Sequence, residues 1–314
     1  MFSLKKNLGL EISQKALRAV KLKKNGGAFE VQWLKEAPLP DGLVQDSFTE
    51  PNLRDIPEFT AAVKGLLNGN ARGSHTAVAL PDYIARVQVL DFDSAPKKDD
   101  AEQMLKWRLK KILPFEIDLA TLRWQYLGKF IVNEKEQHRY LASIIKTEIL
   151  SQYRNALSGA GLNTKRLGLA TFSIWNLFSA NVVRELGNEA DFALMNLSAG
   201  KLSVIIFSKG SPHFMRLKDL GKLDDSGEYP LDVIRILREL NASLVYYKEN
   251  FSSAPVRTVY ITGDAGGVDE LTKEASARSG IDARAFSLAS AVQPGAAVNL
   301  PACFSAACGA ALEI

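Results

Sequence analysis

The sequence predicts an α/β fold of two lobes that arose by duplication, with a cleft between the lobes. Two segments, residues 8–34 and 192–217, share one order of strand, polar turn, strand, turn and strand. Each of these antiparallel meanders is followed by amphipathic helical patterns and further strands. A repeat of this size indicates a duplicated architecture. We place the first lobe at residues 1–172, with an inserted subdomain at about 75–150, and the second lobe at 173–314.

In the first lobe, strands are expected where short apolar or alternating runs lie between turn residues. Helices are expected where apolar residues recur at every third or fourth position. Asn25-Gly26-Gly27 is a strong hairpin signal, Pro38 and Pro40 end the meander, and Gly161 ends a helical pattern. The strands expected here span residues 8–12, 19–22, 29–34, 75–80, 86–92, 122–129, 139–145 and 167–170, and the helices span 56–67, 99–113 and 146–160.

The second lobe repeats this alternation of strands and helices. Its meander turns at Ser198-Ala199-Gly200-Lys201 and again at Ser208-Lys209-Gly210, and a glycine-rich turn follows a later strand at 263–267. The strands expected in this lobe span residues 192–197, 202–207, 212–217 and 258–262, and the helices span 171–186, 231–250 and 268–279.

Composition and charge exclude several classes of protein. Hydrophobic residues make up 46% and charged residues 24% of the 314 residues, which is the balance of a soluble globular protein. The net charge of +4 is small and spread along the chain, so nucleic acid is not an expected partner. The sequence has no signal-peptide pattern and no apolar run of about 18 residues. We therefore expect a cytoplasmic protein that reaches a membrane only through a partner.

Familiar catalytic and metal-binding patterns are missing from the sequence. Cys303 and Cys308 lie among small residues, as is typical of buried packing, and His75, His138 and His213 are scattered. Neither a Walker-type loop nor a Gly-x-Ser-x-Gly motif occurs. We therefore expect no metal site and no catalytic residues.

Three turns carry the candidate cofactor-binding residues, which are Glu11, Ser13, Gln14 and Lys15, then Asn196, Ser198 and Ala199, and finally Gly263, Asp264 and Ala265. In this order the turns resemble the two phosphate-binding hairpins and the adenosine motif of the actin-like ATPase superfamily, and above all of the PilM family of type IV pilus assembly proteins. The resemblance implies an α/β actin-like fold, which is a duplicated ribonuclease H-like fold of two lobes with an inserted subdomain in the first. It also implies ATP and Mg²⁺ as ligands.

The two hairpins depart from the family pattern at chemically important positions. Glu11 stands where the family has Asp, and Ser13 and Ser198 stand where it has Gly. Asn196 replaces an acid, so the carboxylate that organises a metal-bound water for attack on phosphate is missing. In the third turn, Asp264 stands where the family prefers another glycine. We expect no enzyme activity beyond weak ATP hydrolysis.

The middle of the chain also resembles the PilM family. An Ala-Leu-Pro strand end at 79–81, a strand that begins at Arg86 and a helix that ends in Pro114-Phe115 follow the family order. Upstream, residues 38–42 match its Pro-Leu-Pro-x-Gly loop, and the small-residue segment 307–312 is similar to its closing helix. The resemblance thus covers essentially the whole chain.

The end of the helix at 99–113 allows two interpretations. Its candidate partner-binding residues are Trp107, Ile112, Leu113, Pro114 and Phe115. Spacing alone favours core packing before a proline that stops the helix. The resemblance implies instead an apolar groove between the first lobe and its inserted subdomain, which binds the N-terminal cytoplasmic peptide of PilN.

The resemblance implies a scaffold in the inner-membrane platform of a type IV pilus or a related secretion machine. Such a scaffold binds the cytoplasmic tail of a PilN-like membrane partner, lies at the inner-membrane face and helps to contact the pilus assembly ATPase. Nucleotide, if bound, would bias the position of the lobes and would not serve as fuel. Three alternatives remain open, which are a GspL-like cytoplasmic domain of type II secretion, an ATPase or kinase of the actin superfamily, and an FtsA-like polymer.

Overall fold

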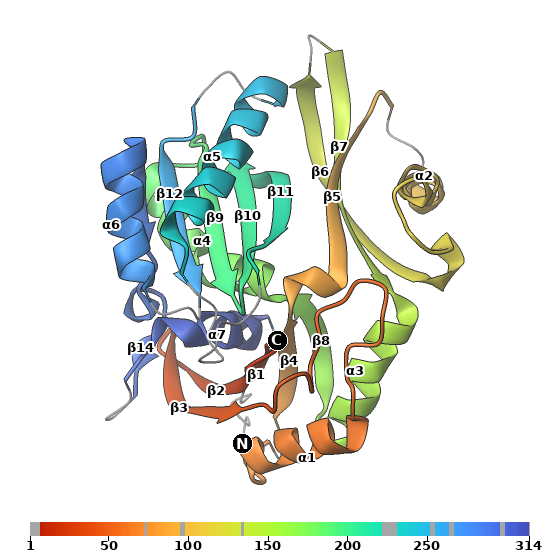
Figure 1. Cartoon of the computed structure of the whole chain (residues 1–314), viewed down its shortest axis with the longest axis vertical. Helices are drawn as coiled ribbons and strands as arrows, with labels where there is room; N and C mark the ends of the chain where they lie inside the picture. The colour runs from red at the N-terminus through yellow and green to blue at the C-terminus, as the bar shows by residue number, and fades with distance from the viewer. Residues whose placement is uncertain are drawn as a thin grey trace.

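Three β-sheets organise the chain in the computed structural model (Figure 1). The structure describes residues 7–71, 74–94, 98–132, 135–221, 231–251, 255–263, 267–295 and 299–313. No helix among these residues is long and apolar enough to cross a membrane.

The first sheet has six strands in the order β14-β3-β2-β1-β4-β8. Their bounds are β1 Asn7–Ile12, β2 Ala16–Asn25, β3 Ala28–Pro38, β4 His75–Leu80, β8 Thr164–Leu169 and β14 Gln293–Pro294. β1 is antiparallel to β2 and parallel to β4, and β4 is parallel to β8. Because side chains alternate along a strand, Leu8, Leu10 and Ile12 of β1 all face the same core. Helices α1 (Ile56–Leu67) and α3 (Thr147–Gly159) cover that face.

The second sheet has five strands in the order β11-β10-β9-β12-β13. Their bounds are β9 Phe192–Ser198, β10 Lys201–Ser208, β11 Ser211–Asp219, β12 Thr258–Gly263 and β13 Asp282–Ala285. β9 is antiparallel to β10 and parallel to β12, as β1 is to β2 and β4. This confirms the predicted duplication. Helices α5 (Val233–Asn250) and α6 (Val268–Ser279) cover the outer face of the sheet.

Two helices fill the space between the first and second sheets, and both belong to the largest core. They are α4 (Ala170–Leu186) and α7 (Ser305–Leu312). A Cβ atom on Gly9 of β1 would lie 1.9 Å from the carbonyl oxygen of Ala307, so helix and strand are in direct backbone contact. A Cβ on Gly309 would lie equally close, at 1.9 Å, to the carbonyl oxygen of Ser173 in α4. The small residues of α7 therefore allow the backbones of β1, α4 and α7 to touch. This contact explains why the segment 307–312 is rich in small residues.

The third sheet is small, with the order β5-β7-β6. Its strands are β5 Ala85–Phe92, β6 Ala120–Val132 and β7 Lys135–Lys146, and α2 (Lys98–Lys110) packs on one face. The described residues also form four short 3-10 helices, which are Asp82–Ile84 (η1), Ile117–Leu119 (η2), Leu288–Ser290 (η3) and Ala302–Phe304 (η4). The sequence reasoning did not predict β13 and β14, because both are short and lack a clear hydrophobic alternation.

Candidate functional site

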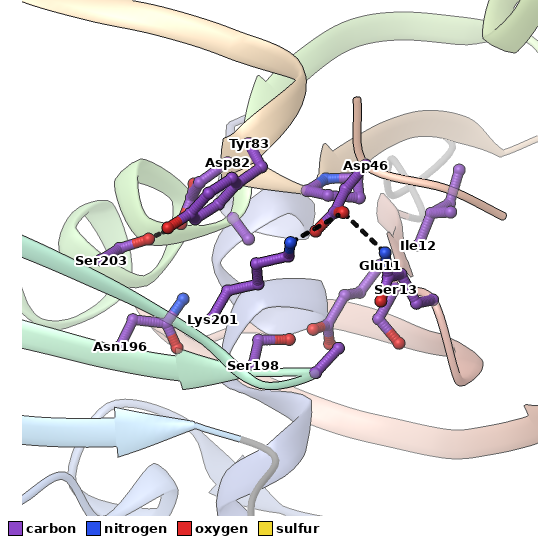
Figure 2. A pocket seen from close by; sticks show the side chains of 14 residues that line it. Glu11, Ile12, Ser13, Asp46, Asp82, Tyr83, Asn196, Ser198, Lys201 and Ser203 are labelled. Carbon is purple, nitrogen blue, oxygen red and sulfur yellow. Dashed lines mark hydrogen bonds and ion pairs between the residues drawn. The ribbon is translucent and has the colours of Figure 1, made fainter. Parts of the chain in front are cut away.

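The predicted hairpins meet at the cleft between the first and second sheets (Figure 2). β1 and β4 of the first sheet and β9 and β12 of the second are parallel pairs, and ligands of α/β proteins bind beyond the carboxyl ends of such strands. Glu11, Ser13, Gln14, Asn196, Ser198 and Ala199, all candidate cofactor-binding residues, line a cavity there. The cavity measures only about 30 Å³.

The first hairpin uses the side chain of Ser13 to complete its own turn. The Ser13 hydroxyl accepts hydrogen bonds from the backbone N–H groups of Lys15 and Ala16, at 3.4 and 3.1 Å. The backbone N–H of Ser13 in turn donates to the carbonyl of Ala16 at 3.0 Å. In a phosphate-binding turn such N–H groups point at the ligand. Here they are directed back into the turn.

Glu11 is buried beside basic residues of its own sheet. Its carboxylate lies 3.6 Å from the guanidinium of Arg18 on β2, and Arg18 also forms an ion pair with Glu36 of β3 at 2.8 Å. The Glu11 side chain is only 6% exposed. Glu11 does line the cleft, but its negative charge is offset by an arginine of the neighbouring strand, which weakens its attraction for Mg²⁺.

The second hairpin places a lysine in the cleft that the sequence reasoning did not select. Ala199 and Gly200 form the two-residue loop between β9 and β10, with φ values of 47° and 71°, as a type I′ turn requires. Lys201 follows, and its ammonium group lies 3.4 Å from Asp46 and 2.8 Å from Asp219. It also lies 4.6 Å from the centre of the Tyr83 ring. Figure 2 shows Lys201 reaching across the cleft to Asp46.

Asp46 is the residue of the first lobe that pairs with Lys201. It comes from the loop between β3 and α1 and accepts a second hydrogen bond, at 2.6 Å, from the side-chain amide of Gln14. Burial raises the pKa of the Asp46 carboxyl from 3.8 to about 6, although Lys201 opposes this shift. Because the lysine and the aspartate come from different lobes, their ion pair spans the cleft.

Asp82 forms a second contact across the cleft. It follows β4, is 7% exposed, and accepts hydrogen bonds from the hydroxyl groups of Thr171 in α4 and Ser203 in β10. The Ser203 distance is 2.7 Å, and the backbone N–H of Thr171 donates at 3.1 Å. Asn196 donates its amide to the hydroxyl of Thr171 at 3.0 Å. Burial raises the pKa of the Asp82 carboxyl, although these hydrogen bonds oppose the shift.

In the third turn, packing against the neighbouring strand explains the glycine at position 263. Gly263 pairs with Leu197 of β9, and a Cβ at Gly263 would lie 2.0 Å from the carbonyl oxygen of Leu197. The glycine is thus required by the neighbouring strand. Asp264 and Ala265, the other candidate residues of this turn, lie outside the described residues.

The described residues of the cleft do not fit a nucleotide with Mg²⁺. A cavity of about 30 Å³ has room for only a few water molecules. Among the described residues, no group of three or more His, Cys, Asp and Glu side chains is arranged to hold a metal ion. The three carboxylates that line the cavity, those of Glu11, Asp46 and Asp82, each interact with side chains of the chain itself.

A much larger groove of about 810 Å³ lies between the first sheet and the third sheet. All six residues of β8 line it, together with residues of β5, β6, β7 and α3. β8 is the last strand of its sheet, so one side of its backbone has no strand partner among the described residues. Lys165, Arg166 and Arg154 also line the groove and form no ion pair within the part of the chain that the structure describes.

The residues predicted to bind a partner lie on the other face of the third sheet. Along β7, Leu141 and Ser143 face the groove, whereas Tyr140 and Ala142 face α2. The five candidates are in or just after α2, and none of them lines the groove. Leu113 and Phe115 pack against the small core, Pro114 is exposed, and Trp107 and Ile112 are 60% and 54% exposed. Leu113 and Phe115 thus occupy the positions that the core-packing interpretation of this helix end predicts.

Comparison with protein families gives a match to the type IV pilus assembly protein PilM over residues 9–224. The matched part includes both hairpins, the third sheet and the groove. The chain belongs to the PilM family.

Solved structures agree on the fold of this PilM-family protein. It is similar to the structure described as a PilM–PilN type IV pilus biogenesis complex, with a TM-score of 0.83, 20% identity and 99% of each chain covered. A protein of unknown function from Bacteroides thetaiotaomicron with an actin-like ATPase fold matches with a TM-score of 0.54 at 8% identity over 93% of each chain. The cytoplasmic domain of EpsL, an inner-membrane component of the type II secretion system of Vibrio cholerae, matches with a TM-score of 0.50 at 11% identity over 90% of this chain and 98% of that domain. The fold is therefore actin-like, as the sequence predicted.

Four side chains that form the cleft were not selected from the sequence. Lys201, Asp46, Asp82 and Asp219 come from different segments and meet only in the folded chain. Asp82 had a usable signal, because it follows the Leu80-Pro81 end of a buried strand, where polar residues of parallel sheets gather. Asp46 lies in an irregular loop without any pattern to mark it.

Proposed function

We propose that this PilM-family protein is a cytoplasmic docking scaffold that binds the N-terminal tail of a PilN-like inner-membrane protein. The observation that carries the proposal is the groove of about 810 Å³ between β8 and the third sheet. It has the size of a binding site and combines an open strand edge with an apolar floor. The chain itself then lies at the inner-membrane face through its partner, where it can also meet the pilus assembly ATPase.

The groove suits an extended peptide. Leu141, Ile145 and Leu167 supply apolar contacts on facing walls. The free backbone edge of β8 offers hydrogen bonds to a peptide backbone, as in other proteins that bind a peptide by adding a strand. The Thr164 hydroxyl lines the groove, is buried, and has no hydrogen-bond partner among the described residues. A bound peptide would provide that partner.

Regulation by ATP, which the resemblance implied, has less support than peptide docking. The candidate residues of the described cleft are engaged with one another, and the cavity between them is small. The GspL-like alternative shares the fold, because the EpsL domain matches it, but the family match favours a pilus system.

The test is binding of a fluorescent peptide with the N-terminal sequence of the PilN-like protein from the same organism. Ser143→Arg places a large charged side chain on the groove face of β7, and Trp107→Arg does the same on the exposed face of α2. We expect Ser143→Arg to abolish binding and Trp107→Arg to leave it unchanged. Loss of binding only in Trp107→Arg would place the tail on α2, and undiminished binding in both variants would exclude the groove.

A further inference from the structure

We propose that this chain holds its lobes together with its own ion pairs in place of a nucleotide, so that the groove binds its partner equally well with and without Mg-ATP. This inference rests on the proposed docking function of the groove. It departs from a nucleotide-biased scaffold, and three features of the cleft support it.

The first feature is the ion-pair bridge through Lys201. A nucleotide in an actin-like cleft would interact with both hairpins, and Lys201 already connects them by a direct path within the protein. Its ammonium group interacts with Asp46 at 3.4 Å, and Asp46 accepts a hydrogen bond from Gln14 in the first hairpin. The Lys201 and Asp46 side chains are 18% and 8% exposed, so solvent screens their attraction little.

The second feature is the small space between the described hairpins, together with the engagement of N–H donors in the first of them. Ligand sites of drug size measure roughly 300–1,000 Å³. The space left between the hairpins is about 30 Å³. In the first hairpin, the N–H groups of Lys15 and Ala16 are bonded to the Ser13 hydroxyl. A triphosphate between the described hairpins would have to displace Lys201 from two carboxylates and open the first turn to reach its N–H groups.

The third feature connects the cleft to the groove along a short stretch of chain. Asp82 and Tyr83 belong to η1, and β5 begins directly afterwards with Ala85. Ala85 and Val87 line the groove. Asp82 is fixed to Ser203 of the second lobe, and Tyr83 lies under Lys201. The same side chains that close the cleft therefore fix the start of the groove wall.

A separate contact holds the far end of that wall. Arg139 of β7 forms a two-point ion pair with Asp91, at 2.7 Å for each bond, and its remaining nitrogen lies 2.8 Å from Nδ1 of His213 in β11. The third sheet is thus held against the second lobe at two places, by η1 and by Arg139.

The experiment measures peptide affinity with and without millimolar Mg-ATP for the wild-type protein, Lys201→Met and Lys209→Met. Lys209 forms an ion pair with Glu189 in which both side chains are exposed, so its variant is a control for loss of one positive charge. Calorimetry with Mg-ATP alone runs in parallel. Ser203→Ala, which removes one donor to Asp82, is a milder variant that tests the same connection if Lys201→Met does not fold.

We expect no saturable heat with Mg-ATP and the same peptide affinity in its presence and absence. Lys201→Met and Ser203→Ala should weaken peptide binding by about 5-fold or more, at the lower end of known couplings between sites, and Lys209→Met should not. Saturable ATP binding that changes the peptide affinity would overturn the inference, as would unchanged affinity in both cleft variants. If the wild-type protein binds no peptide at all, the docking function fails, while the calorimetry still decides whether the cleft accepts nucleotide.

Discussion

Asp46 and His213 give the stability of the protein two pH dependences of opposite sign. Burial raises the pKa of Asp46 from 3.8 to about 6 and lowers the pKa of His213 from 6.5 to about 4, with Arg139 adding to the second shift. Since the folded Asp46 holds its proton more tightly than the unfolded chain does, its contribution to stability is greatest below pH 3.8 and is lost as the pH rises to about 6. The folded His213 binds its proton less tightly than the unfolded chain does, so its contribution to stability is present above pH 6.5 and is lost as the pH falls to about 4.

The two contributions are similar in size. Each folded pKa differs from its ordinary value by a little over 2, and one pKa step corresponds to about 1.4 kcal/mol. Each group therefore changes the free energy of unfolding by about 3 kcal/mol across nearly the same pH range. In the wild-type protein the two changes largely cancel. Variants that remove one group should reveal the other.

The assay is urea unfolding between pH 4 and pH 7.5. Relative to the wild-type protein, Asp46→Asn should gain about 3 kcal/mol of stability as the pH rises through this range, because it removes the cost of ionising a buried carboxyl. His213→Gln, whose amide oxygen can still accept the Arg139 hydrogen bond, should show the reverse slope. Asp41→Asn, at an exposed ion pair with Lys15, is the control and should follow the wild-type protein. If the free energy of unfolding changed with pH in the same way in Asp46→Asn and His213→Gln, the reasoning would be refuted.

Two further predictions concern packing and buried charge. Gly309→Ala should destabilise the protein by about 3 kcal/mol or more, because its new methyl group would meet the backbone of Ser173. Gly65→Ala, at an open position in the last turn of α1, should instead stabilise the protein by up to about 1 kcal/mol. Thermal unfolding of both variants checks this, and similar melting temperatures would contradict it. Arg139→Met should cost about 3–5 kcal/mol in urea unfolding, because it leaves Asp91 without its two-point partner. Lys129→Met, at an exposed pair with Glu136, should leave the urea midpoint nearly unchanged, and equal losses of stability in the two variants would argue against a stabilising role for the buried ion pair of Arg139 with Asp91.

The sequence predicted the fold well because its strongest signals are local. The Asn25-Gly26-Gly27 turn and the alternation of Leu8, Leu10 and Ile12 fix the first meander without reference to the rest of the chain. The first strand pair does extend further than expected, because Ala16 already belongs to β2.

The site was harder to predict, because its decisive contacts join distant segments. The sequence indicated the two hairpin turns that line the cleft, but the interaction of Lys201 with Asp46 depends on how two lobes meet, which no local pattern reports. The prediction for Trp107 to Phe115 identified an apolar helix end and assigned it to the groove wall. Alternate residues of β7 face opposite sides of the third sheet, and the helix end packs on the side of Tyr140 and Ala142, away from the groove.

The position of α7 has a consequence for how the chain folds. Asn7 in the first strand donates its side-chain amide to the carbonyl of Ala311 at 3.0 Å, across 304 positions of sequence. During synthesis, β1 leaves the ribosome long before α7 exists, so the face of β1 around Gly9 stays uncovered while the second lobe is made. Because α7 packs between the sheets only after the second lobe has been made, a chaperone that shields apolar surface would act on this protein mainly before that packing.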